Sequence, residues 1–164
     1  MSHGEMTIEV KDEGEDLQLM SAALAGQTET VAALLRRGVD VNARNDEGRT
    51  ALMFAVINMH AATVQKLLEF GADVNAQADD GFTPLILAAC SGDFAIAQAL
   101  LNSGADASKT LTSGQTALSH AAQHGYSDIV ELLKRAMTRS KEAKSQTVPH
   151  QRETIKSVLT LPSQ

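Results

Sequence analysis

The sequence is poor in aromatic residues and in cysteine. It has no tryptophan, one tyrosine and one cysteine among 164 residues, and aromatic side chains make up only 3% of the chain. A single cysteine cannot form an internal disulfide, so a disulfide framework is excluded, and the low cysteine content fits a reducing compartment. Because Ala and Leu are abundant instead, we expect a core of closely packed helices with small side chains.

Long apolar runs are also missing. Charged or polar residues interrupt every run before it reaches the roughly 18 residues that a membrane helix needs. The first residues, MSHGEMTIEVKDEGED, contain no basic region followed by an apolar one, which argues against a secretory signal. The glycines never form the GxGxxG or GxxxxGK(S/T) pattern of a phosphate-binding loop. We therefore expect a cytoplasmic protein without a membrane segment.

Charge is unevenly distributed along the chain. Residues 1–133 contain 7 basic and 18 acidic side chains, a net charge of −11, whereas residues 134–164 contain 7 basic and 2 acidic ones, a net charge of +5. The acidic body should repel nucleic acid and anionic membranes, and only the C-terminal segment could attract either. Nucleic-acid binding through the basic tail is thus an alternative function that the charge of the body disfavours.

An internal repeat of 33 residues runs through the chain. Its clearest markers are two glycine series, Gly48, Gly81 and Gly114, and Gly38, Gly71 and Gly104. The second series opens the segments GVDVN, GADVN and GADAS, and paired leucines precede it in the same register. Three series in one register predict a stack of similar units, none of which can bury both faces of its helices alone.

Each unit contains the signals of two helices joined by a turn. The residues that can cap the first helix through a hydroxyl group are Thr50, Thr83 and Thr116. Pro84 suits the first helical position of the third unit. The glycines that can end the first helix with a positive φ are Gly26, Gly92 and Gly125. Met59 replaces this glycine in the second unit, and we expect Asn58 to take the left-handed conformation there.

A 33-residue unit with Thr-Pro-Leu at 83–85, paired alanines at 88–89, a double leucine and Gly-Ala-Asp-Val-Asn at 71–75 resembles the ankyrin repeat. The resemblance covers residues 15–136 as about four units: 15–47, 48–80, 81–113 and 114–136. It implies an all-α solenoid of stacked antiparallel helix pairs with projecting β-hairpin-like turns. It also implies a non-catalytic scaffold that binds other proteins.

The first unit lacks the usual start, and the chain before it is acidic. We expect residues 1–14 to form an acidic N-terminal extension, and Asp16 to act as the N-cap of a polar capping unit. The array should stop at residue 136, because Met137 replaces the next expected glycine.

Residues 137–164 form a basic tail outside the repeat. Their polar composition predicts disorder. Within this tail, Ile155, Val158 and Leu159 have the spacing of a short amphipathic turn, which could dock on the last unit or on another protein.

Three residues suggest a different class of function. His120 and His124 lie four positions apart on a predicted helix, as two zinc ligands can, and Cys90 could act as a nucleophile. No Glu follows His120, no third ligand has a clear spacing, and no orienting acid accompanies Cys90 in the required order. We therefore expect a packed His120, a surface His124 and a half-exposed thiol. A small metal-binding protein or enzyme that uses these residues is the alternative.

Positions that vary between units while their flanks stay fixed are the best candidates for partner binding. In the resembled family such positions line one concave face. The turn strip consists of Arg44, Asp46, Glu47, Arg49, Gln77, Asp79, Asp80, Phe82, Lys109, Thr112, Ser113 and Gln115, and the helix strip of Ile57, Asn58, Cys90, Ser91, Gln123 and His124. Phe82 is the candidate anchor, because an aromatic residue on a polar turn has little core to serve. The other interpretation is that it packs on an adjacent turn.

Together these patterns predict a monomer that binds another protein, of basic or mixed charge, through the concave face. It would act as an adaptor or an inhibitor, with no cofactor and no bound metal. A preorganised stack would lose little entropy on binding.

Overall fold

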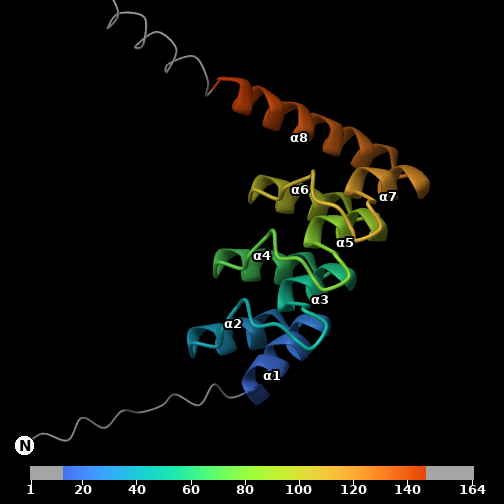
Figure 1. Ribbon diagram of the computed structural model, residues 1–164. Helices are drawn as coiled ribbons and strands as arrows, with labels where there is room; N and C mark the ends of the chain where they lie inside the picture. Colours follow the sequence, from blue (N-terminus) through green and yellow to red (C-terminus); the bar gives the residue numbers. More distant parts are fainter. Residues whose placement is uncertain (1–12, 147–164) are drawn as a thin grey trace, which may run out of the picture.

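The computed structural model describes residues 13–146 of the chain. The helices of this part are α1 (Glu13–Leu24), α2 (Thr28–Arg36), α3 (Ala51–Ile57), α4 (Ala61–Glu69), α5 (Pro84–Ser91), α6 (Phe94–Asn102), α7 (Ala117–Gln123) and α8 (Ser127–Gln146). Helices α1, α3, α5 and α7 pack successively in one row, and α2, α4, α6 and α8 form a second row. The stack runs from α1 at one end to α8 at the other (Figure 1). The predicted all-α solenoid is confirmed.

The core lies between the two rows and repeats with the sequence. Leu52 in α3 and Leu67 in α4 are 0% exposed, and their counterparts in the next unit, Leu85 and Leu100, are 1% and 0% exposed. Alanines that let neighbouring helices approach closely are fully buried as well: Ala55, Ala88 and Ala121. Each unit therefore buries its apolar face against its neighbours, as expected of a repeat array.

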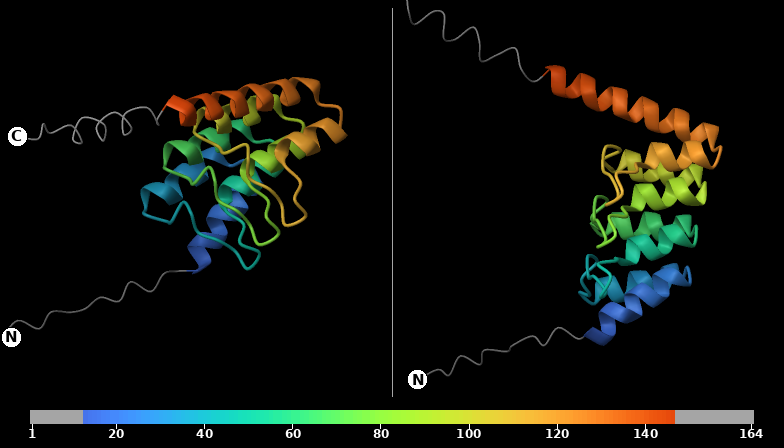
Figure 2. Two further views of the ribbon diagram at one scale, coloured as in Figure 1. Left: turned by 45° about the horizontal axis from the view of Figure 1, so that its top comes forward. Right: turned by 45° about the vertical axis from the view of Figure 1, so that its right-hand side comes forward.

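Three loops project from one side of the stack as fingers (Figure 2). They comprise residues 43–49, 76–82 and 109–115, each between a second helix and the next first helix. A hydrogen bond closes each finger, from Asn45 to Arg49, from Ala78 to Phe82 and from Leu111 to Gln115, with N···O distances of 3.0, 2.9 and 2.8 Å. Within residues 13–146 the β-type pairing is limited to one bridge, Thr110 with Thr116, so the fingers resemble hairpins without forming strands.

Two of the three predicted threonine caps are made. The hydroxyl of Thr83 accepts from the N–H of Ile86 at 3.2 Å, and Pro84 occupies the first turn behind it. Thr116 forms a reciprocal capping box with Ser119. Thr50 also lies at an N-cap position, but its buried hydroxyl has no hydrogen-bond partner among the described residues.

The turn after α3 differs from the prediction. Met59 has a φ of 56°, whereas Asn58 has a φ of −94°, so the expectation of a left-handed Asn58 is wrong. The reason is the hydrogen-bond register of the turn: Met59 N–H donates to Val56 at 3.0 Å, as Gly26 N–H donates to Ala23 at 3.2 Å. Because the repeat fixes this register, the residue at the glycine position takes the positive φ. The Asn58 amide instead donates to the carbonyl of Phe54 at 3.1 Å.

Two expectations about the ends of the array differ from the structure. Helix α1 begins at Glu13, so Asp16 lies inside the helix and is not its N-cap. The early start brings Glu15 into an ion pair with Arg37, beyond the end of α2.

Helix α8 continues to Gln146, ten residues beyond the predicted last residue of the array, and residues 137–146 are therefore helical rather than disordered. With Met137 in place of a glycine, nothing ends the helix, and most of the following residues are good helix formers. The expectations for residues 1–12 and 147–164 lie outside the described residues. No helix in the described part is long and apolar enough to cross a membrane.

Candidate partner-binding surface

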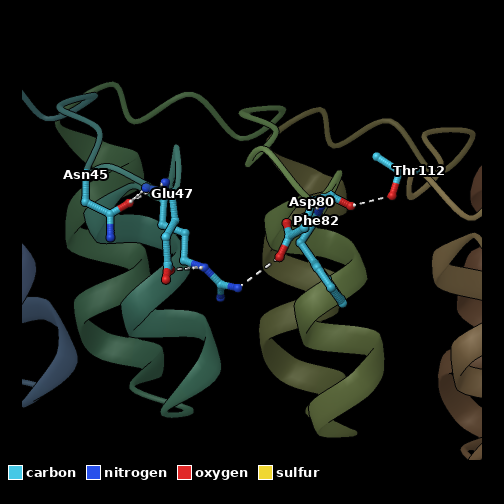
Figure 3. Close-up of polar contacts among 6 residues, drawn as sticks. Asn45, Glu47, Asp80, Phe82 and Thr112 are labelled. Atoms are coloured by element: carbon cyan, nitrogen blue, oxygen red, sulfur yellow. Dashed lines mark hydrogen bonds and ion pairs between the residues drawn. The ribbon is translucent and has the colours of Figure 1, made fainter.

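Arg49 ties the first finger to the second. Its Nη2 lies 3.0 Å from Oδ2 of Asp80, and its Nε lies 3.1 Å from Oε2 of Glu47. The Asn45 side chain supports this loop by accepting from the N–H groups of Glu47 and Arg49 at 3.1 and 2.8 Å. Figure 3 shows these contacts extending from Asn45 past Asp80 to Thr112. The Arg49 side chain, only 23% exposed, thus holds two fingers together.

The second finger is tied to the third by side chains that donate to backbone carbonyls. Thr112 donates to the carbonyl of Asp80 through its hydroxyl at 3.3 Å, and the Gln77 amide donates to the carbonyl of Thr110 at 2.8 Å. The two backbones nearly touch at Gly81, where a Cβ would lie 2.8 Å from the backbone nitrogen of Thr112. The fingers therefore form one continuous edge rather than three independent loops.

A ladder of asparagines joins the bases of the fingers. Oδ1 of Asn42 accepts from the N–H of Asp73 at 2.7 Å, and Oδ1 of Asn75 accepts from the N–H of Asp106 at 2.8 Å. The amide group of Asn42 also donates to the carbonyl of Gly71, and that of Asn75 donates to the carbonyl of Gly104. This ladder was not predicted, although the recurring Asn at the end of GVDVN and GADVN was its visible signal.

The ladder ends at Ser108, which stands where the third Asn would be. Its hydroxyl donates to Oδ1 of Asp106 in its own loop at 2.6 Å. The hydrogen bonds from the Ser108 side chain and backbone lower the pKa of Asp106, and the positive charges of Lys109 and Lys144 act in the same direction. The loop is thus closed on itself, with no asparagine amide to extend to a further unit.

Four rings form an aromatic row from the finger edge to the opposite edge of the stack. The ring centroids of Phe82 and His120 lie 6.3 Å apart, those of His120 and His124 6.4 Å, and those of His124 and Tyr126 5.8 Å. Phe82 is half-buried and packs against the core, with its ring next to that of His120 in α7. The row links the turn strip with the helix strip. His120 and Tyr126, which complete it, were absent from both predicted strips.

An apolar row runs along the stack from one unit to the next. Leu24, Ile57 and Cys90 occupy equivalent positions in α1, α3 and α5, and Gln123 holds the fourth. Leu24 is 46% exposed, and Ile57 and Cys90 are half-buried. Burial raises the pKa of the Cys90 thiol, so this side chain acts as a small apolar group. Leu24 was missed in the sequence, although stepping back 33 residues from Ile57 identifies it.

We call the surface formed by the fingers and the exposed ends of α1, α3, α5 and α7 the finger face. The remaining predicted residues also lie on it. Those that are exposed are Arg44, Asp46, Glu47, Asp79, Asp80, Thr112, Ser113, Asn58, Gln123 and His124, and those that are half-buried are Gln77, Lys109, Gln115 and Ser91. Arg44 donates to the carbonyl of Gln77, so both arginines of the first finger contact the second.

His120 and His124 make different contacts. His124 is exposed and directs Nδ1 to the carbonyl of His120 at 2.9 Å, while Nε2 of the half-buried His120 is enclosed without a hydrogen-bond partner in residues 13–146. In the same part of the chain, no three His, Cys, Asp or Glu side chains lie close enough together to hold a metal ion.

Paired helices in two rows, linked fingers and a 33-residue period define a stacked repeat protein. The family model for ankyrin repeats in three copies matches residues 19–111 and 77–145. These matches cover well over half of the sequence, and the chain belongs to the ankyrin repeat family. No curated protein matches the chain. Ankyrin repeats are protein–protein interaction modules, and the chain is an interaction module in this general sense.

Proposed function

We propose that the chain binds a protein partner through the finger face and acts as an adaptor or an inhibitor without catalysing a reaction. The observation that carries the proposal is a division of roles on this face. Polar side chains such as Arg49 and Asn75 fix the fingers and their bases to one another, while the apolar side chain of Leu24 stays nearly half exposed. A surface that is already ordered loses little conformational entropy when a partner binds.

The apolar row suggests the shape of the partner. Packed helices lie about 8–10 Å apart, so Leu24, Ile57 and Cys90 should follow one another at about that interval. Residues seven apart on an α-helix are separated by about 10.5 Å. A partner helix with an apolar residue every seventh position could therefore place one side chain on each member of the row.

The charges on the fingers suggest the charge of the partner surface that would face them. Asp46, Glu47 and Asp79 expose carboxylates at the finger tips, whereas Arg44 and Arg49 are turned to the second finger. A basic or mixed-charge partner would complement this edge, and added salt should slow its association. We place the interaction in the cytoplasm, because one cysteine in 164 residues fits a reducing compartment.

The test is capture of the partner from native cells, read by quantitative mass spectrometry. The finger-face variant combines Leu24→Glu with Asp79→Lys. The matched control makes the same types of change at exposed positions away from the fingers, Phe94→Glu with Glu131→Lys, in the groove between α6 and α8.

A specific partner should fall at least about tenfold in the finger-face capture, the loss expected when a hot-spot contact worth about 1.4 kcal/mol is removed. It should persist with the control variant. Both variants must give wild-type circular dichroism. If the control loses the partner and the finger-face variant keeps it, the proposal is wrong.

A further inference from the structure

The last finger base borders a groove at the C-terminal end of the stack. Residues 104–108 form one wall, and the other wall is the part of α8 around Met137, where a regular unit would already have turned. The groove has a volume of about 410 Å³, enough for several side chains. The groove lies at Ser108, where the asparagine ladder stops. The ladder stops there because the Ser108 side chain bonds within its own loop.

The groove is lined by both apolar and charged residues. Ala105 and Ala107 face Ala136 and Met137 across it, and Ala107 is only 8% exposed. The charged groups that line the groove are Asp106, Lys141 and Lys144. Such a groove suits a short segment of mostly aliphatic side chains with few charges.

The chain supplies such a segment after α8. Residues 155–161, IKSVLTL, contain four aliphatic residues and one charged residue, Lys156. The α8 helix runs about 15 Å from Ala136 to Gln146. The eight residues 147–154 can span up to about 27 Å when extended, so segment 155–161 can return to the groove.

We propose that residues 155–161 dock in this groove and cap the C-terminal end of the stack. The segment takes the place that the finger base of a complete fourth unit would occupy beside residues 104–108. Because the segment is tethered, its effective concentration at the groove is on the order of millimolar, so even a weak contact is populated. Terminal units of repeat arrays need such a cover for the face that no neighbour buries.

The test uses the full chain and substitutions in residues 155–161, which leave the described fold unchanged. The docking variant combines Ile155→Asp with Leu159→Asp. Its control adds the same two charges at polar positions, Ser157→Asp with Thr160→Asp. Backbone amide spectra are compared with the wild type, with attention to residues 104–108 and 136–144.

The docking variant should shift the amide signals of both groove walls, while the control leaves them near their wild-type positions. The signals of the fingers should not move in either variant. Equal spectra for the docking variant and the wild type would overturn the proposal. Groove signals that move on tenfold dilution of the wild type would assign the groove to a second copy and would overturn it as well.

Discussion

The two edges of the stack are held together by different interactions. At the finger edge, hydrogen bonds and close backbone contacts join each finger to the next. At the opposite edge, where the helices of a unit turn into one another, rings pack on glycines: His60 on Gly26, and Tyr126 on Gly92. A Cβ on either glycine would lie within 2.6 Å of the ring above it.

We call this opposite edge the turn edge. Its middle junction, between the second and third units, lacks a ring packed on a glycine. Met59 replaces the glycine, and Asp93 stands where the next unit would place the ring. Met59 can therefore carry a side chain, which is 56% exposed, and Asp93 instead caps α6 by accepting from the N–H of Ile96. Close backbone contacts therefore leave little room for substitution at the finger edge. At the turn edge, the glycine and the ring that packs on it can be replaced together.

The strictest test of this difference is Gly81→Ala. Gly81 has a φ of 91°, and a Cβ there would lie 2.8 Å from a backbone nitrogen of the next finger. A left-handed alanine costs about 1–2 kcal/mol, and the backbone overlap should raise the loss of unfolding free energy to about 3 kcal/mol. Urea unfolding followed by circular dichroism measures it.

Gly114→Ala is the matched control for that experiment. Gly114 has a φ of 83°, but a Cβ there meets nothing within 4 Å. The control should lose only about 1 kcal/mol. Equal losses in the two variants would mean that the fingers do not depend on close backbone contact.

The asparagine ladder gives the next largest effect. Asn75→Ala removes two hydrogen bonds to the following finger base and should lower the unfolding free energy by about 1–2 kcal/mol. Ser108→Ala removes only a bond within its own loop and should cost less than about 0.5 kcal/mol. A Ser108→Ala loss as large as that of Asn75→Ala would contradict the role assigned to the ladder.

Met59→Gly should act in the opposite direction. It relieves a non-glycine residue at positive φ and removes a side chain that is more than half exposed. The added flexibility of the unfolded chain offsets part of this relief, so we expect a gain of about 0.5 kcal/mol. A decrease in thermal stability would show that the Met59 side chain itself holds the turn edge.

Alkylation of Cys90 tests the surface between the two edges, in an experiment that does not depend on a change in stability. Burial raises the pKa of its thiol above the ordinary 9.0, and only the thiolate reacts with iodoacetamide. The alkylation rate of the folded chain at pH 8 should therefore be lower than that of an ordinary exposed thiol and should keep rising as the pH is raised further. The same chain in urea is the control, and equal rates at pH 8 would mean that the apolar row does not enclose the thiol.

The repeat explains why so much of the fold was predictable. Threonine caps, glycines and paired leucines follow one 33-residue period, and the register of Met59 could have been derived from that period as well. The ends were not predictable in this way, since α1 and α8 continue where no repeated signal marks a boundary. Local spacing could not reveal the whole aromatic row either, because its first contact joins Phe82 of one unit to His120 of the next.

Hydrogen exchange of the chain, alone and with its captured partner, tests the central claim most directly. If the finger face binds the partner, amides in residues 43–58 and 76–91 should exchange more slowly in the complex. Those of α2 and α4 should be unchanged. Protection confined to α2, α4 and α6, with the fingers exchanging as in the free chain, would contradict the account.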